Sequence, residues 1–429
     1  MGKKLVFITT RLFWPPDSGR KASLYHYCKG LHEQLGYELY VYAFLEGGQL
    51  AEDMIPYPSF LEDVRIARPV SAFEKAKNLL LSLLDSNMPL QCAIYWSGAN
   101  LNAIRSYCKE KSPDIVMIDM IRLAPYIDAL DETDCARVLD YDDLLSKRYE
   151  RQMGKSGGNP LGNYGAQASG LINSLMSNRA VKKAVLSIES RRTRGAEEKY
   201  ARQADAVLFV SPVEAAEFNK KLGANKSLSA TVGAEILEFS AALSRKEYDF
   251  GFVGNMNTAA NQASLDYICS EILPLLPGKT LRVIGVCPEN VQRHYSGFEQ
   301  LSFSGRVDSI GAELLRCKIM LAPFVYGTGI KTKVLEAMGM GVPVVTNSIG
   351  VEGLTCKSGI DLECGEAPGE LARICLTLLE DPKRRASIGS AGKEYVRQNH
   401  SWHTSIENLG RCLEFALREH AGNTREELL

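Results

Sequence analysis

The stretch PFVYGTGIKTKVLEAMGMGVPVVTNSIG, residues 323–350, decides the fold of this chain. The apolar run Lys318–Phe324 predicts a short buried strand, and a glycine loop after it opens a helix whose apolar positions share one face. A second apolar run, Met340–Val345, predicts the next buried strand. This order is typical of an α/β domain that binds a ligand at the carboxyl ends of parallel strands.

The start of the predicted helix has the features of an anion site. Backbone N–H groups lack partners at a helix N-terminus, and the helix dipole favours negative charge there. Lys331 and Lys333 fall in the first turn, where the dipole disfavours cations. A bound anion such as a diphosphate is the simplest compensation for at least one of them. Glu336 follows in an otherwise apolar segment, where a charged side chain requires a partner.

The pattern GxGxKxKxxEAMxxGxPVV, residues 327–345, resembles the donor-binding signature of retaining GT-B glycosyltransferases, specifically glycosyltransferase family 4. In that family the Glu of EAM holds the ribose of a nucleotide-sugar, and the basic residue before it meets the diphosphate. By position these are Glu336 and Lys331, and the loop Asn347–Gly350 would complete the pocket.

One position departs from the family pattern. Many members carry a second Glu, eight positions before the ribose Glu, that touches the donor sugar, and this chain has Thr328 there. The resemblance then implies that backbone amides around Gly327 and Gly329, or other side chains, hold the sugar. The amides of Gly327–Ile330, together with Lys331, would stabilise the departing diphosphate.

Length and composition restrict the class of protein. A chain of 429 residues exceeds what one hydrophobic core usually supports, so two domains are expected. A formal net charge of −1 argues against nucleic-acid binding, which normally requires a basic surplus. Eleven cysteines without a CxxC pair indicate buried thiols in a reducing cytoplasm. No run of about 18 apolar residues occurs, so no membrane-spanning segment is expected.

The rest of the chain repeats the pattern of buried strands and helices, which predicts two Rossmann-like halves. The resemblance implies the GT-B architecture, in which two such domains face each other across a cleft. Residues 1–243 would form the acceptor-binding domain and residues 244–400 the nucleotide-sugar-binding domain. The segment 401–429 would be a helix that packs back on the first domain, and its apolar stripe suits that role.

Loops after other strands add predicted donor contacts. Gly19 and Arg20 follow the first strand, in a loop that closes on the donor diphosphate in the resembled family; a plain loop with solvated charges is the alternative. Gly254 opens a loop that offers backbone amides. Arg306 and Val307 occupy a turn that lies against the nucleotide base in the resembled enzymes.

Two aspartates follow the strand predicted at residues 136–140. Asp142 and Asp143 lie at the carboxyl edge of the sheet, where chemistry is done, and are predicted as catalytic groups that face the acceptor hydroxyl or the reacting sugar. Capping of a helix that begins at Leu144 explains them equally well. Both interpretations remain open at this point.

The segment after these aspartates is the part of the chain that could contact a membrane surface. Residues Lys147–Ala168 are predicted to be a loop, and Leu171–Tyr200 one or two helices rich in Lys and Arg. A basic helical face suits an anionic lipid surface or a lipid-diphosphate acceptor, although such a face is more often simply solvated. Peripheral contact with the inner membrane surface is therefore kept beside a purely cytoplasmic location.

The leading hypothesis is a retaining glycosyltransferase that moves a sugar from a nucleotide-sugar, with UDP as the expected nucleotide, to a hydroxyl of a glycan or lipid-linked acceptor. In such a mechanism the leaving phosphate accepts the acceptor's proton, so neither a metal nor a cofactor is expected. Thr328 keeps a catalytically silent partner subunit as the alternative, whereas the retained Lys331 and Glu336 count against it. An NAD-type enzyme requires GxGxxG after the first strand, and residues 11–20 lack it.

Overall fold

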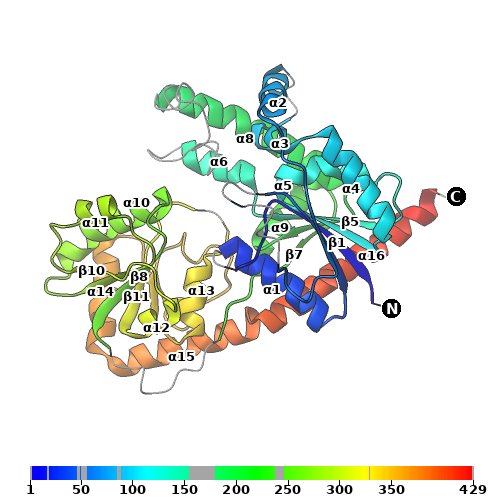
Figure 1. Ribbon diagram of the computed structural model, residues 1–429. Helices are drawn as coiled ribbons and strands as arrows, with labels where there is room; N and C mark the ends of the chain where they lie inside the picture. Colours follow the sequence, from blue (N-terminus) through cyan, green and yellow to red (C-terminus); the bar gives the residue numbers. More distant parts are fainter. Residues whose placement is uncertain are drawn as a thin grey trace. The chain divides into compact units, whose positions relative to one another are not determined.

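The computed structural model describes residues 2–16, 19–45, 49, 56–84, 88–153, 179–236, 246–327 and 329–427. The chain divides into two compact units, Met1–Thr231 with Ile406–Leu429, and Val232–Ser405 (Figure 1). The boundary expected at residues 243 and 244 therefore differs from the observed one, because Val232–Ile236 belong to the second unit.

The first unit contains a parallel sheet with the strand order β3-β2-β1-β4-β5-β6-β7 in the described part of the chain. Its central strands are continuous apolar runs because helices cover both faces of a parallel sheet. The strands are β1 (Lys4–Thr9), β2 (Glu38–Ala43), β3 (Asp63–Ile66), β4 (Ile115–Asp119), β5 (Ala136–Asp142), β6 (Ala206–Phe209) and β7 (Ser227–Ser229).

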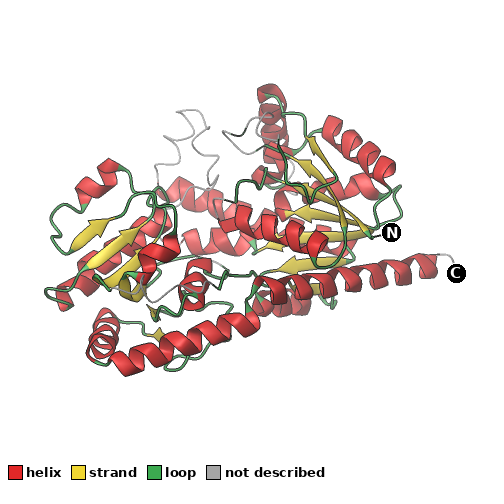
Figure 2. Cartoon of the chain, turned by 60° about the horizontal axis from the view of Figure 1, so that its bottom comes forward, coloured by secondary structure: helices red, strands yellow, loops and turns green. Residues whose placement is uncertain are grey.

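Helices connect most of these strands, whereas no described helix separates β2 from β3; Figure 2 shows helices and strands by colour. They are α1 (Gly19–Glu33), α2 (Ala72–Leu84), α3 (Leu90–Tyr95), α4 (Gly98–Lys111), α5 (Met120–Leu123), a 3-10 helix (Ala124–Leu130), α6 (Leu145–Met153), α8 (Arg179–Gln203) and α9 (Pro212–Leu222). The prediction of a loop from Lys147 is wrong as far as Met153, because Leu145, Ser146 and Tyr149 pack α6 against the unit. The rest of that predicted loop lies outside the described residues.

The second unit contains a parallel sheet with the order β10-β9-β8-β11-β12-β13 among its described residues. The strands are β8 (Tyr248–Val253), β9 (Leu281–Ile284), β10 (Leu301–Phe303), β11 (Cys317–Ala322), β12 (Val344–Thr346) and β13 (Glu363–Cys364). The helices are α10 (Ala259–Tyr267), a π-helix (Ile268–Ile272), a 3-10 helix (Leu273–Leu275), α11 (Glu289–His294), α12 (Ile310–Leu315), α13 (Thr332–Gly339), α14 (Pro368–Glu380) and α15 (Pro382–Asn399).

The last helix, α16 (Trp402–Glu427), contributes to both units. From Ile406 onward it belongs to the first unit, where Gly30 of α1 lets it approach closely. A Cβ at Gly30 would lie only 2.4 Å from Cγ1 of Ile406. The helix therefore completes the first unit although it follows the second in sequence.

The chain passes between the units twice, at Thr231–Val232 and at Ser405–Ile406. The segments of the second unit next to these two points are hydrogen-bonded to each other. The N–H of Ala234 donates to the carbonyl of His400 (2.7 Å), and the His400 ring nitrogen Nδ1 lies 3.3 Å from the carbonyl oxygen of Val232. Gly233 packs directly against Trp402 at this crossing. A Cβ on Gly233 would lie 2.4 Å from the indole Cδ2 and 2.9 Å from the Trp402 Cα.

Gly233→Ala is therefore expected to lower the free energy of unfolding by about 1–3 kcal/mol, because neither the backbone nor the indole can yield freely. Urea unfolding followed by tryptophan fluorescence measures this change. Gly195→Ala is the matched control, since no atom lies within 4 Å of its Cβ position in α8. Alanine there should stabilise the helix by roughly 0.5–1 kcal/mol. An equal change in the free energy of unfolding for the two variants would contradict the close packing at Gly233.

Candidate functional site

The predicted donor residues gather at one edge of the second unit's sheet. Strands β8 and β11 are neighbours at the centre of this sheet. The strand that follows β8 in the chain, β9, lies on one side of the pair, and the strand that follows β11, β12, lies on the other side. The strand order therefore reverses between β8 and β11. Ligands of open α/β sheets bind at such a reversal, beyond the carboxyl ends of the strands. Gly254 follows β8, and residues 323–331 follow β11. Arg306 and Val307 follow β10 at the same edge of the sheet, and Arg306 is exposed.

The helix after the glycine loop begins later than the sequence predicts. Gly329 has a φ of +66°, a left-handed conformation that glycine adopts without cost, and α13 starts at Thr332. Lys331 is therefore the residue that precedes the helix, and Lys333 alone of the two lysines lies in the first turn. Thr328, the position of the missing sugar-contacting Glu, lies outside the described residues.

Lys331, the predicted diphosphate ligand, binds its own loop. Its ammonium donates to the carbonyl oxygen of Gly329 (2.5 Å) and lies 3.7 Å from the carboxylate of Glu352. Only 9% of the side chain is exposed. In this conformation Lys331 stabilises the glycine loop from which backbone amides project.

Lys333 has fewer polar partners among the described residues than Lys331 has, and a clearly lowered pKa. Its Nζ donates to Oδ1 of Asn261 (2.7 Å) and lies 5.8 Å and 5.4 Å from the ring centroids of Phe252 and Phe324. An ammonium group can donate three hydrogen bonds, and Asn261 is its one acceptor among the residues that the structure describes. Burial lowers the pKa of Lys333 to about 8, with a smaller opposing effect of Glu336. A desolvated cation at a helix N-terminus suits an anionic ligand.

Glu336 lies one turn after Lys333 on the same face of α13. Burial raises the pKa of its carboxyl group, Lys333 lowers it and Glu235 adds to the rise. No hydrogen bond or ion pair joins this carboxylate to another described residue, Lys331 and Lys333 included. The partly buried carboxylate can therefore accept hydrogen bonds from a ligand or from water.

Asn347 has a structural role instead. Its Oδ1 accepts from the N–H of Phe324 (3.1 Å), and its Nδ2 donates to the carbonyl of the same residue (2.8 Å). The side chain thus fastens the end of β12 to the end of β11. This bond fixes the origin of the glycine loop.

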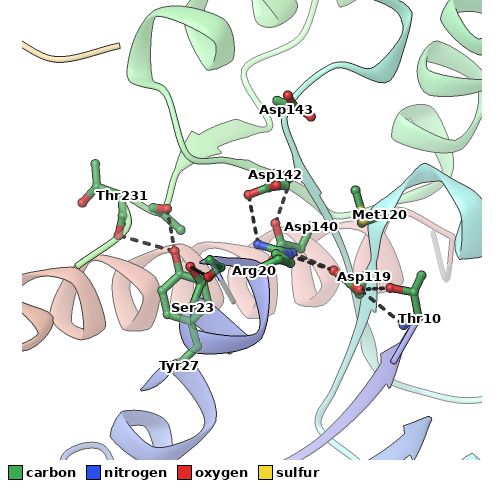
Figure 3. Close-up of polar contacts among 12 residues, drawn as sticks. Thr10, Arg20, Ser23, Tyr27, Asp119, Met120, Asp140, Asp142, Asp143 and Thr231 are labelled. Atoms are coloured by element: carbon green, nitrogen blue, oxygen red, sulfur yellow. Dashed lines mark hydrogen bonds and ion pairs between the residues drawn. The ribbon is translucent and has the colours of Figure 1, made fainter. Parts of the chain in front are cut away.

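The first unit has its own reversal of strand order, between β1 and β4, and charged residues gather there (Figure 3). Arg20, in the first turn of α1, binds three carboxylates. Its Nη2 lies 2.7 Å from Oδ1 of Asp119 and 2.7 Å from Oδ2 of Asp140, and its Nη1 lies 3.1 Å from Oδ1 of Asp142. These carboxylates hold the pKa of Arg20 above its usual range despite burial. The guanidinium predicted to contact the donor is thus occupied by carboxylates of its own unit, and Gly19 is simply the first residue of α1.

The two predicted catalytic aspartates differ. Asp143 is 6% exposed and binds Nη2 of Arg148 with both oxygens (2.6 and 2.7 Å). Asp142 is 27% exposed and has a left-handed backbone with φ +62°. Burial raises the pKa of Asp142 to about 6, while Arg20 opposes that rise.

The start of α6 is served by a residue that the sequence analysis missed. Glu197 of α8 accepts from the N–H of Ser146 (3.1 Å) and from its hydroxyl (2.6 Å). This contact weakens the alternative in which the aspartates serve as helix caps. Asp119, Asp140 and Asn261 were missed as well. The available signal was a polar residue at the carboxyl end of an apolar strand or, for Asn261, in the first turn of the helix that follows the strand.

No helix among the described residues is both long and apolar enough to cross a membrane. No three His, Cys, Asp or Glu side chains are grouped in the described part so as to hold a metal ion.

Comparison with known proteins places this geometry in context. Residues 247–381 match the family model described as "Glycosyl transferases group 1". A GDP-mannose-dependent monoacylated alpha-(1-6)-phosphatidylinositol monomannoside mannosyltransferase of Corynebacterium glutamicum is 35% identical over 88 residues. That match covers 20% of this chain and 23% of the relative, so it spans less than a quarter of the relative's length.

Solved structures resemble the whole chain. HepE from Anabaena, in complex with UDP and glucose, has 15% sequence identity and a TM-score of 0.65, and the match covers 96% of this chain and 99% of HepE. Sucrose-phosphate synthase from Thermosynechococcus elongatus has 13% identity and a TM-score of 0.64, with 95% and 98% covered. The predicted fold class is confirmed: the chain has the GT-B fold, built from two Rossmann-like domains with parallel sheets.

Lys333→Met is expected to stabilise the ligand-free protein at pH 7. The folded-state pKa of Lys333, about 8, lies below the ordinary value of 10.5, so folding disfavours the charged form. The wild type therefore gains stability as pH rises from about 8 to about 10.5, and Met avoids a cost of at most about 3 kcal/mol at neutral pH. Urea unfolding at pH 7 and pH 9.5 measures the difference, which should narrow at the higher pH.

Lys383→Met provides the control, because Lys383 is exposed at the start of α15. It should change stability little at either pH. A Lys333→Met variant that is clearly less stable than the wild type at pH 7 would show that the native state favours the charged lysine.

Proposed function

We propose that this protein is a retaining glycosyltransferase that transfers a sugar from a nucleotide-sugar, with UDP as the nucleotide, to an acceptor hydroxyl in cell-surface polysaccharide or glycoconjugate synthesis. One observation carries the proposal. Lys333 and Glu336 lie partly buried on one face of α13, at the edge where the strand order reverses, with hydrogen-bonding capacity that the described residues leave unused. The match of residues 247–381 to the group 1 family and the UDP bound in HepE support it.

Different parts of the nucleotide-sugar would contact different groups of the site, according to their charge. Lys333, the amides of the glycine loop and the N-terminus of α13 suit the diphosphate, because negative charge grows there as the bond to the sugar breaks. Glu336 suits the ribose hydroxyls, which donate hydrogen bonds. Lys331 then acts by holding the loop in place. Gly254, Arg306 and Val307 remain predicted contacts at the same edge.

The transfer itself needs positioning and charge stabilisation more than a protein nucleophile. The bond from the sugar C1 to the phosphate oxygen breaks, the acceptor oxygen bonds to C1 on the same face, and the leaving phosphate takes the acceptor's proton. The charge of the leaving group is met by groups of the chain itself, so we expect neither a metal nor an organic cofactor to be required.

Thermal unfolding in the presence of UDP, GDP, ADP or NAD tests the donor site. UDP at about 100 times its dissociation constant should add roughly 2.7 kcal/mol to stability, a readable rise in Tm. Glu336→Ala and Lys333→Met should abolish the rise, and Lys383→Met should keep it. If no nucleoside diphosphate raises the Tm of the wild type, the donor site is refuted and a silent partner subunit becomes the better description.

We propose in addition that the protein contacts an anionic membrane surface, and that α2 makes the contact. Phe73 and Leu80 are 80% and 60% exposed, and they lie two turns apart on one side of this helix. Lys77 lies between them and is exposed, so apolar and cationic groups occur together, as in interfacial helices. Asn78 fastens α2 to α3 through the carbonyls of Ala93 and Trp96.

The basic helix α8 contributes less to this proposal than the sequence suggests. Arg192 pairs with Glu189 and Arg194 with Glu150 within the first unit. These pairs offset part of the positive charge that α8 would present to a bilayer.

Vesicle flotation tests the membrane contact. The protein should float with vesicles of phosphatidylcholine and phosphatidylglycerol and much less with phosphatidylcholine alone, because both apolar insertion and charge attraction are needed. Phe73→Ser combined with Leu80→Ser should prevent flotation. Val213→Ser, at a residue of α9 that is 56% exposed, is the control and should float like the wild type. Unchanged flotation of the α2 double variant would exclude α2 as the contact.

A further inference from the structure

Arg20 and its three partners, Asp119, Asp140 and Asp142, form a cluster whose side chains differ in solvent exposure. The side chains of Asp119 and Asp140 are 0% and 5% exposed, Arg20 is 10% exposed, and Asp142 is 27% exposed. One guanidinium therefore stands among three carboxylates, two of them buried. The third, Asp142, is the most exposed member of the cluster.

Both buried carboxylates use both of their oxygens. Oδ2 of Asp119 accepts from the hydroxyl (2.8 Å) and the N–H (3.3 Å) of Thr10, while Oδ1 binds Arg20. Oδ1 of Asp140 accepts from the N–H of Asp142 (3.1 Å), while Oδ2 binds Arg20. Asp142 differs, because Oδ1 binds Arg20 and no described residue donates to Oδ2.

The backbone also places Asp142 in an unusual way. Its φ of +62° is left-handed, and the pairing of β5 with β6 shifts register between Asp140 and Asp142. Met120, directly after β4, is left-handed too, with φ +64°. Residues with side chains adopt this conformation only where their surroundings impose it, often at functional sites, and a register shift of this kind re-aims a side chain.

We propose that Asp142 receives the acceptor hydroxyl through its Oδ2, and that Arg20 is a positioning residue that holds Asp142 for this contact. The proposal rests on the proposed transferase function and assigns Arg20 a role other than donor binding. Asp119 and Asp140 fix the guanidinium, the guanidinium fixes Oδ1 of Asp142, and Oδ2 is left for a hydroxyl donor. The ligand class is an alcohol of a glycan or lipid-linked acceptor, or water in its place.

The charges around Asp142 determine the expected pH dependence. Arg20 of α1 and Arg148 of α6 favour its ionised form, whereas Asp140 of β5 and the adjacent Asp143 disfavour it; Asp119 of β4 lies behind Arg20. Burial has the largest effect and raises the pKa to about 6. A carboxylate accepts a hydroxyl hydrogen bond better than a carboxylic acid does, so activity should rise as pH passes about 6. Arg20→Gln removes a cation and should move this rise to higher pH.

Stability should change in the opposite sense to activity. The folded-state pKa of Asp142 lies above its ordinary value of 3.8, so the wild type loses stability as pH rises from about 4 through about 6. Asp142→Asn removes the charge and keeps a residue that tolerates the left-handed backbone. This variant should be at least as stable as the wild type at pH 7.5, whereas a purely structural ion pair predicts a loss.

The test measures release of UDP from UDP-glucose and UDP-N-acetylglucosamine with water as the acceptor, beside the UDP-induced rise in Tm. Arg20→Lys and Asp142→Asn should each slow release at least tenfold and keep the UDP-induced rise. The double variant should be no slower than Asp142→Asn alone, because Arg20 acts through Asp142. Arg137→Lys, at the other end of β5 and paired with Asp131, is the control and should release UDP like the wild type.

Each other outcome has a separate meaning. Additive losses, or a lost UDP-induced rise in Arg20→Lys, would overturn the positioning role and make Arg20 a donor ligand. Absence of any UDP effect in the wild type would refute the transferase function instead.

A second experiment requires no turnover: the pH titration of the Asp142 carboxyl group followed by ¹³C NMR, in which the Asp142 signal is identified by its loss in Asp142→Asn. Its midpoint should lie near 6 and move upward in Arg20→Gln, and an unchanged midpoint would overturn the proposal.

Discussion

Parallel strand pairing with one reversal of strand order in each sheet is the constraint on which the rest of the structure depends. Parallel pairing brings all carboxyl ends to one edge, and the reversal separates the loops that leave two neighbouring strands. In the second unit these loops follow β8 and β11, and in the first they follow β1 and β4. The candidate site residues lie at these two places, where ligands of open α/β sheets bind.

The two units use buried charge differently. The second unit keeps a cation and an anion on α13 with little compensation from the chain, which shifts the pKa of Lys333 down and that of Glu336 up. The first unit surrounds Arg20 with carboxylates and leaves only Asp142 partly open. In the second unit folding disfavours the charged forms of both groups, which costs stability in the free protein. In the first unit the cost falls on Asp140 and Asp142, whose pKa values burial raises, whereas the pKa of Asp119 is lowered and that of Arg20 is raised.

The sequence was sufficient for much of the fold. Runs such as LVFIT and IVMID are buried on both sides, so their strand character follows from composition alone, and GxGxKxK identified the loop before α13 correctly. It was not sufficient for the contacts of Lys331 and Lys333, because Asn261 and Glu352 come from other segments of the chain. The carboxylates around Arg20 could not be predicted for the same reason, since they lie about a hundred residues away in the chain. The loop predicted from Lys147 cut short the helix that begins near Leu144, and the carboxylate at the start of that helix, Glu197, belongs to another helix.

The shared membership of α16 has a consequence for the order in which the protein is made. The second unit, Val232–Ser405, is one uninterrupted segment, whereas the first unit is incomplete until the residues after Ile406 have been synthesised. A ribosome therefore releases all of the second unit's residues before the first unit receives its last helix. Domains generally fold as units during synthesis, and the N-terminal one usually finishes first. Here the usual order is reversed: in the nascent first unit the surface beneath Ile406, Leu409 and Leu413 stays uncovered until α16 has been synthesised.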